Sequence, residues 1–130
     1  NKFYNMNRSS FIIEKGNGNF NLELYSADNY LLVRSKPFTT LRECEKFIDT
    51  LKVHMCFQTN FCRSKSRLGQ YGFEIRTCWD ELIGCSLWFQ TREDRELAMQ
   101  QAFVANKDAV FVDKKMYVQA PQQLSLLGVA

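Results

Sequence analysis

The sequence has few of the side chains from which metal centres are built. It contains one histidine, His54, and five cysteines, and no two cysteines are spaced as C-x-x-C. A structural zinc site takes about four Cys or His ligands, usually in closely spaced pairs. Cys56 and Cys62 lie too far apart for such a pair, and so do Cys78 and Cys85. The sequence therefore predicts no metal site, and it contains no nucleotide-cofactor motif.

Features of membrane and secreted proteins are also missing. No apolar run approaches the length of about 18 residues that a membrane-spanning helix needs, and the chain does not open with the pattern of a signal peptide. An odd number of widely spaced cysteines is typical of free thiols in a reducing compartment. We therefore expect a cytoplasmic protein without a membrane segment. The net charge of +3 is too small to indicate a nucleic-acid-binding protein by itself.

The reactive side chains do not form the pattern of an enzyme. His54 and Cys56 could act as base and nucleophile, but nothing near them in the sequence supplies a third, orienting group. A histidine near a helix end is favoured by the helix dipole in any case. The segment GNG at 16–18 lacks the following helix of a phosphate-binding loop, so it predicts a hairpin turn. We expect a non-catalytic protein.

What the sequence does contain is apolar residues and an internal repeat. Hydrophobic residues make up 45% of the 130, which predicts one packed domain spanning 1–130. A shift of 51 residues superposes 11–56 on 62–107 without a gap, which predicts a tandem duplication with repeats at about 10–59 and 60–113. The matched pairs include Gly18 and Gly69, Phe20 and Tyr71, Glu23 and Glu74, Ser35 and Ser86, Phe38 and Phe89, and Thr40 and Thr91.

Each repeat predicts three strands, a helix and a further strand. The segments FNLELY and YGFEIRT alternate apolar and polar residues, as in a strand with one buried face. A tight turn follows, in which Asn29 and Asp80 tolerate a positive φ. Thr40 and Thr91 are expected to cap the helices. Extended segments follow each helix, near 57–65 and 108–113.

The apolar stripe of each helix can cover only one face of a sheet. The predicted fold class is therefore α+β, with two β(3)-α-β repeats that form one largely antiparallel sheet and both helices on one face. The other face carries Asn21, Glu23, Glu74 and Arg76. We expect it to meet water.

The two matched patterns resemble the YegP-like family of small bacterial proteins. In each repeat the pattern is Gly-x-(Phe/Tyr)-x-(Leu/Phe)-x-(Leu/Ile), a turn, then (Leu/Ile)-x-x-Ser-x-x-Phe-x-Thr. The resemblance covers about residues 10–113 and implies two β(3)-α-β repeats in one sheet, with their C-terminal strands exchanged. It implies no activity. The family usually has Asn-Gly in the inner hairpin turn, where this chain has Asp28-Asn29 and Trp79-Asp80.

The most polar strand is a candidate binding site for a polyanion. Arg63, Lys65 and Arg67 alternate along RSKSR and would project to one side of a strand, about 6–7 Å apart. Tyr71 and Trp79 could provide stacking faces for single-stranded nucleic acid. The alternative is a charged strand end that prevents edge pairing.

A second hypothesis is a non-catalytic interaction module. An open sheet leaves its edges available for a protein partner or a second copy. The tail at 119–130 carries an apolar cluster that either docks on its own domain or inserts into a partner.

Overall fold

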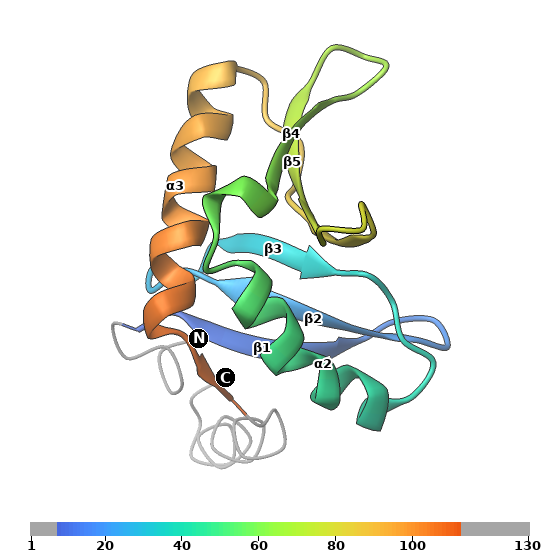
Figure 1. The fold of residues 1–130 in the computed structure, drawn as a ribbon. Helices are drawn as coiled ribbons and strands as arrows, with labels where there is room; N and C mark the ends of the chain where they lie inside the picture. Colours follow the sequence, from blue (N-terminus) through green and yellow to red (C-terminus); the bar gives the residue numbers. More distant parts are fainter. Residues whose placement is uncertain (1–7, 113–130) are drawn as a thin grey trace, which may run out of the picture.

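The computed structural model of the chain describes residues 8–112, which form a single sheet with two α-helices (Figure 1). In chain order the elements are β1 (Ser10–Lys15), β2 (Phe20–Tyr25), β3 (Leu31–Ser35), α2 (Leu41–His54), the 3-10 helix η1 (Gln58–Asn60), β4 (Phe61–Lys65), β5 (Tyr71–Arg76), β6 (Leu82–Cys85), α3 (Arg92–Asp108) and β7 (Val110–Phe111). Neither helix of this range is long and apolar enough to cross a membrane. The predicted tail at 119–130 lies outside the described residues.

The sheet has seven strands in the order β4-β5-β6-β3-β2-β1-β7. All neighbours are antiparallel except β1 and β7, which are parallel. At its centre β3 pairs with β6, so the meanders β1-β2-β3 and β4-β5-β6 join into one sheet. The prediction of an α+β fold with a largely antiparallel sheet is confirmed.

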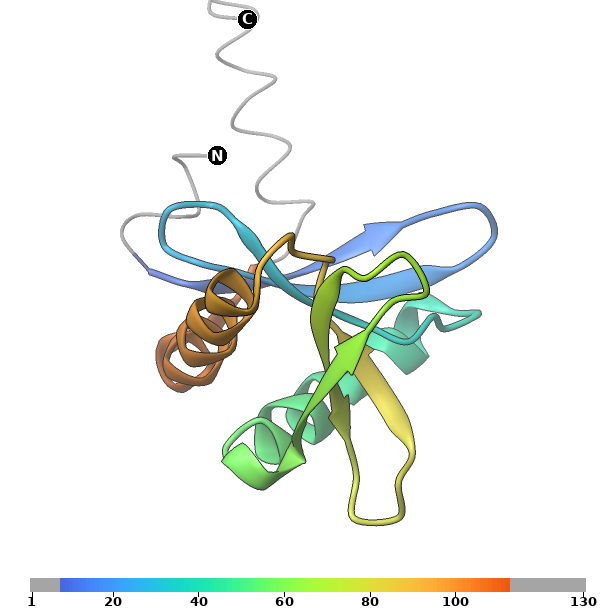
Figure 2. The ribbon, with the colours of Figure 1, turned by 90° about the horizontal axis from the view of Figure 1, so that it is seen from above.

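Both helices cover the same face of this sheet, as predicted (Figure 2). Cys44 and Leu51 of α2 and Ala98 and Ala102 of α3 belong to one buried core. The strands contribute Phe11, Ile13, Leu22, Leu24, Leu32, Val33, Phe61, Phe73, Ile75 and Ile83 to it. The apolar stripes of the two helices are therefore buried against a shared interior.

Residues at matching positions of the two halves set the geometry of turns and helix starts. Asn29 and Asp80 have φ of 72° and 63°, in the left-handed region that these residue types tolerate. Thr40 and Thr91 cap α2 and α3, and each side-chain oxygen accepts a backbone N–H three residues later at 3.1 Å. These local predictions are confirmed.

Ser35 and Ser86 occupy matching positions at the end of the third strand of each half. Their side chains hydrogen-bond this strand end to the second strand. Ser35 Oγ accepts the N–H of Leu22 (2.8 Å), and Ser86 Oγ accepts the N–H of Phe73 (2.9 Å). Each hydroxyl also donates to the carbonyl of the residue that follows it, at 2.8 and 2.7 Å. A serine is suited to this place because its hydroxyl both accepts and donates.

The aromatic residues at matching positions of the two halves connect the segment after the third strand to the first residue of the second strand. Phe20 and Phe38 exchange two backbone hydrogen bonds of 2.8 Å, and Tyr71 and Phe89 do the same at 2.8 and 2.6 Å. Gly18 and Gly69, with φ of 76° and 84°, lie in the turns just before them. The residues of the repeat signature thus form the backbone hydrogen bonds and turns that the two halves have in common. The common origin of the two halves stays a prediction.

The gapless superposition of the halves is wrong at their first strands. Phe11 lies opposite Leu24, and Phe61 lies opposite Ile75, so these strands are equivalent at a shift of 50 residues rather than 51. The reason is the turn between β4 and β5, which is one residue longer than the turn between β1 and β2. Phe61, not Cys62, therefore takes the buried place of Phe11.

Two further expectations need correction. The strand expected near 57–65 begins only at Phe61, because residues 58–60 form η1. The exchange of C-terminal strands runs in one direction only within residues 8–112: β7 pairs with β1 of the first half, whereas β4 pairs with β5 of its own half.

Candidate functional site

The extra residue in the β4–β5 turn directs the basic side chains of β4 toward the helices. Arg63 lies on the same face of β4 as the buried Phe61 and forms two hydrogen bonds with Glu96 of α3, Nε to Oε2 at 2.7 Å and Nη2 to Oε1 at 2.6 Å. Hydrogen bonds from Arg63 are the main reason why the pKa of Glu96 falls to about 2. The charge of Arg63 is thus balanced within the molecule.

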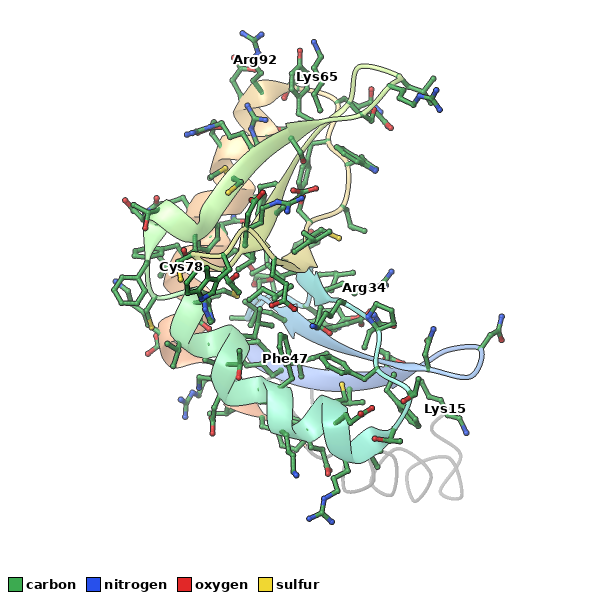
Figure 3. All side chains as sticks on the ribbon, turned by 45° about the vertical axis from the view of Figure 1, so that its right-hand side comes forward. Lys15, Arg34, Phe47, Lys65, Cys78 and Arg92 are labelled. Atoms are coloured by element: carbon green, nitrogen blue, oxygen red, sulfur yellow. The ribbon has the colours of Figure 1, made fainter. Side chains whose placement is uncertain are left out.

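Lys65 and Tyr71 are brought together, and two arginines of α3 join them. The Nζ of Lys65 lies 5.4 Å from the ring centroid of Tyr71, and the guanidinium carbons of Arg92 and Arg95 lie at 5.7 and 5.5 Å. Figure 3 shows Lys65 and Arg92 next to each other at one end of the molecule. The ring of Tyr71 is therefore already in contact with cations of its own chain.

Arg95 is the buried member of this group. Its Nη1 donates to the carbonyls of Ser64 and Gly72 at 3.3 and 3.4 Å, and its Nε donates to Glu96 at 2.9 Å. These bonds connect α3 to both strands of the β4–β5 hairpin. Burial of a guanidinium requires such partners, so Arg95 is a structural residue.

The other two predicted site residues lie elsewhere. Arg67 belongs to the turn after β4, and Trp79 belongs to the turn after β5, which is the opposite end of that strand. Trp79 is 88% exposed. Figure 3 shows its neighbour Cys78 well away from Lys65. The structure thus groups Arg63, Lys65 and Tyr71 on one hairpin and does not bring Trp79 to them.

The uncovered face of the sheet is less open to water than predicted. Glu23 is only 2% exposed, because its two carboxylate oxygens accept hydrogen bonds from Arg34 Nε (2.6 Å) and the Tyr25 hydroxyl (2.7 Å). Arg76 and Glu74 form a similar pair at 2.8 Å. The charges of this face bind one another. Within residues 8–112, no group of three or more His, Cys, Asp or Glu side chains could hold a metal ion.

A more distinctive feature is the outer edge of the sheet at β4. The N–H of Ser66 donates to the carbonyl of Gln70, which closes the hairpin (2.8 Å). Since backbone groups alternate along an antiparallel ladder, those of Phe61, Arg63 and Lys65 point away from β5. No other strand of the described chain pairs with them.

A hollow of about 330 Å³ lies between β4 and α3, beside this edge. Phe61 and Phe103 meet edge-to-face in its wall, with ring centroids 6.1 Å apart. Its remaining lining comes from Gln58, Arg63, Glu96, Met99 and Gln100. The hollow therefore has a mixed lining, with three apolar side chains and four polar or charged ones.

The equivalent place in the first half of the molecule is filled. There β7 lies along β1, with the N–H of Val110 donating to Ser9 O (3.2 Å) and the N–H of Val112 to Phe11 O (2.9 Å). Ala109, just before β7, is part of the buried core. Lys52 of α2, which corresponds to Phe103 of α3, donates to the carbonyl of Ala109 at 3.1 Å.

Comparison with known proteins supports the fold. No protein-family model and no curated protein matches the sequence. Among solved structures, a protein of unknown function from E. coli, YegP, matches with a TM-score of 0.73 and 17% identity, over 82% of this chain and 92% of that chain. The chain has the YegP fold.

A UPF0339 protein from Shewanella oneidensis agrees, with a TM-score of 0.72 and 12% identity over 81% of this chain and 90% of that one. The α+β fold that the resemblance to YegP-like proteins implied is therefore confirmed, while the two-repeat origin stays a prediction. At these identities the likeness carries the fold and no function. YegP itself is described as a protein of unknown function, so the site has to be argued from this chain.

Sequence reasoning expected open sheet edges and a charged strand end at 63–67, but it missed the hollow beside β4 and the buried place of Arg95. One signal was available: Arg95 corresponds to Cys44, so a cation stands where the first half has a core residue. A second signal was that only one strand, β4, lies between α2 and β5 in the sequence. No further strand is therefore left there to be an outer neighbour of β4, as β7 is of β1.

Proposed function

We propose that this protein is a non-catalytic interaction module that receives an extended segment of another protein at β4. One observation carries the proposal: β1 and β4 are equivalent strands, and β7 pairs with β1 at Ser10 and Phe11, whereas no described strand pairs with the outer edge of β4. The hollow between β4 and α3 lies where the first half buries Ala109. The fold thus contains one occupied strand-binding place, at the start of β1, and an uncovered outer edge on the equivalent strand β4.

Strand addition suits these features. Backbone hydrogen bonds to an exposed edge provide affinity, and pockets for alternate side chains provide specificity. Proteins usually shorten, charge or cover such an edge, because it promotes aggregation. Here β4 is charged at Arg63 and Lys65 but keeps five residues, and its outward backbone groups lie beside the hollow.

The placement of the reactive residues supports a non-catalytic role. His54 Nδ1 lies 2.8 Å from the carbonyl of Thr50, and Cys56 Sγ donates to the carbonyl of Lys52 at 3.2 Å. Both side chains thus interact with their own helix. Burial raises the pKa of the Cys44 thiol to about 11, which opposes its use as a nucleophile. The cytoplasmic location stays a prediction from the cysteine spacing.

A proline substitution tests the proposal. A display library of extended seven-residue peptides is selected on the full chain, and selected peptides are then measured on Lys65→Pro and Lys65→Ala. Proline removes the outward N–H and is tolerated at a sheet edge, while alanine removes the side chain alone. We expect Lys65→Pro to bind about tenfold more weakly than Lys65→Ala, as for the loss of about one hydrogen bond.

Circular dichroism and thermal unfolding establish that both variants are folded. Equal binding by the two variants, or bound peptides that shift no backbone amide of β4 in ¹⁵N spectra, would overturn the proposal. A library without any binder would do so too.

Binding of single-stranded nucleic acid or another polyanion is the second candidate function. The observation that favours it is that two exposed cations, Lys65 and Arg92, lie together at the ring of Tyr71. Its test is a titration with a single-stranded oligonucleotide over a series of salt concentrations. Phosphate contacts release counterions, so the affinity must fall linearly with salt on logarithmic axes. A flat response would exclude this function.

A further inference from the structure

We infer that the segment received at β4 runs parallel to it, with an apolar side chain in the hollow and an acidic side chain four residues later. This inference rests on the proposed function and adds the chemical class and the direction of the partner. It follows from an uneven distribution of side chains along β4, which is apolar at Phe61 and cationic at Lys65.

The apolar end is defined by the hollow. Phe61, Met99 and Phe103 supply its apolar lining, beside the first residue of β4. At the equivalent place of the first half, the small side chain of Ala109 is buried with only 5% exposure. A small or medium apolar side chain of the incoming strand therefore suits the hollow, since it removes apolar surface from water.

The cationic end is defined by Lys65 and its neighbours. Lys65 and Arg92 are both exposed, and they lie together at the ring of Tyr71. Arg67 follows in the next turn. Between the two ends, Arg63 is neutralised by Glu96. The excess positive charge is thus concentrated about four residues, or roughly 13 Å, beyond Phe61.

The direction follows from the occupied place. There β7 is parallel to β1, and it uses carbonyls of Ser9 and Phe11, which point outward from β1. The outward carbonyl of Phe61 in β4 is equivalent to that of Phe11, and the outward groups of Arg63 and Lys65 continue the same edge. If the incoming strand is parallel to β4, its residue beside Phe61 comes first and its residue beside Lys65 comes four residues later. The expected sequence pattern is therefore apolar-x-x-x-acidic.

A second copy of the chain fits this edge poorly. Antiparallel pairing of two β4 strands centred on Ser64 would place Arg63 of each copy opposite Lys65 of the other, and like charges opposite each other destabilise a sheet. Residues 113–130 contain one acidic residue, Asp113, followed by Lys114 and Lys115. The expected pattern is absent within 113–130; it occurs at 109–113, but there Ala109 is already buried in the core of its own chain. We therefore assign the site to an acidic segment of a different protein.

Three capped peptides test the inference on the full chain. The first is Thr-Val-Thr-Gln-Thr-Glu-Thr, the second has the same residues in reverse order, and the third has Lys in place of Glu. Binding is measured from the ¹⁵N amide shifts of β4. We expect the first peptide to bind about fivefold more tightly than the third, as for a partly exposed charge pair. Lys65→Glu should reverse this preference, whereas Lys46→Glu, the same charge change on α2, should keep it.

Each other outcome has a defined meaning. Equal binding of the first and third peptides would overturn the acidic class but leave strand addition intact. Tighter binding of the reversed peptide would overturn the parallel direction. Tighter binding of a peptide with the sequence of residues 113–130 would assign the site to a second copy and overturn the inference. If no peptide shifts the amides of β4, the inference fails, whereas the proposed function is judged by the library and the proline variant.

Discussion

Arg95 and its surroundings show what single residues contribute to this molecule. The position corresponds to the buried Cys44 of the first half, yet it holds a guanidinium that is 7% exposed. Its hydrogen bonds to Ser64, Gly72 and Glu96 offset the cost of burying the charge. Through Arg95 and Arg63, Glu96 connects α3 with the outer hairpin. One carboxylate thus helps to hold β4 beside the hollow.

The Glu96 carboxylate should make stability depend on pH in a defined window. Its pKa is lowered from about 4.5 to about 2 in the folded chain, mainly by the hydrogen bonds from Arg63. A lowered pKa gives a stabilisation that is complete above the ordinary pKa and is lost as the pH falls through the folded one. Because the pair is partly exposed, we expect Glu96→Gln to lower the free energy of unfolding at pH 7 by less than about 1 kcal/mol.

Urea unfolding of both proteins between pH 7 and pH 2 measures this difference, which should shrink below about pH 4.5 and be largely lost at pH 2. Glu93→Gln, in the first turn of the same helix, is the control. A difference that stays constant down to pH 2 would contradict the assigned role of the ion pair.

At the scale of elements, the two serine junctions offer a matched comparison. Ser35 and Ser86 accept backbone N–H groups in the same way, but Ser35 is 4% exposed and Ser86 is more open to solvent. An unpaired buried N–H costs about 1–3 kcal/mol, while an exposed one can bind water. We expect Ser35→Ala to lower the free energy of unfolding by that amount and Ser86→Ala by clearly less. Chemical denaturation measures both, and equal losses would show that burial does not decide the cost.

Most elements could be predicted because their determinants are local. The helix starts follow from Thr40 and Thr91, and the positive φ of Asn29 and Asp80 follows from the need for a tight turn. The register of β4 could not be predicted in this way. It depends on one additional residue in a turn, and a shift of one residue moves every side chain of a strand to the other face.

On the scale of the whole molecule, β1 and β4 differ because the last described strand, β7, pairs with β1 alone. β7 covers β1, and the described chain contains no strand that covers β4. This asymmetry cannot arise within either half alone. It appears only when both halves share a sheet and the last strand crosses to the first.

If β7 is displaced from β1, the outer edge of β1 should become able to receive an added strand, as we propose for β4. Val110→Pro removes the N–H that donates to Ser9, whereas Val110→Ala keeps it. We expect Val110→Pro to lower the free energy of unfolding by about 1–3 kcal/mol more than Val110→Ala, from lost hydrogen bonds and exposure of Ala109. A peptide with the sequence of residues 107–112 should then raise the midpoint of thermal unfolding of Val110→Pro alone. An equal effect of this peptide on the unchanged protein would contradict the account.

The sequence by itself determined the strands, the capped helices, the α+β class and the side of each helix that is buried. These follow from hydrophobic period, turn chemistry and capping, which act over a few residues. The tertiary structure alone decided which strand lacks a neighbour, why Arg63 faces α3, and where a hollow remains. Those features depend on the packing of segments distant in the chain, and on the passage of β7 to the far edge of the sheet.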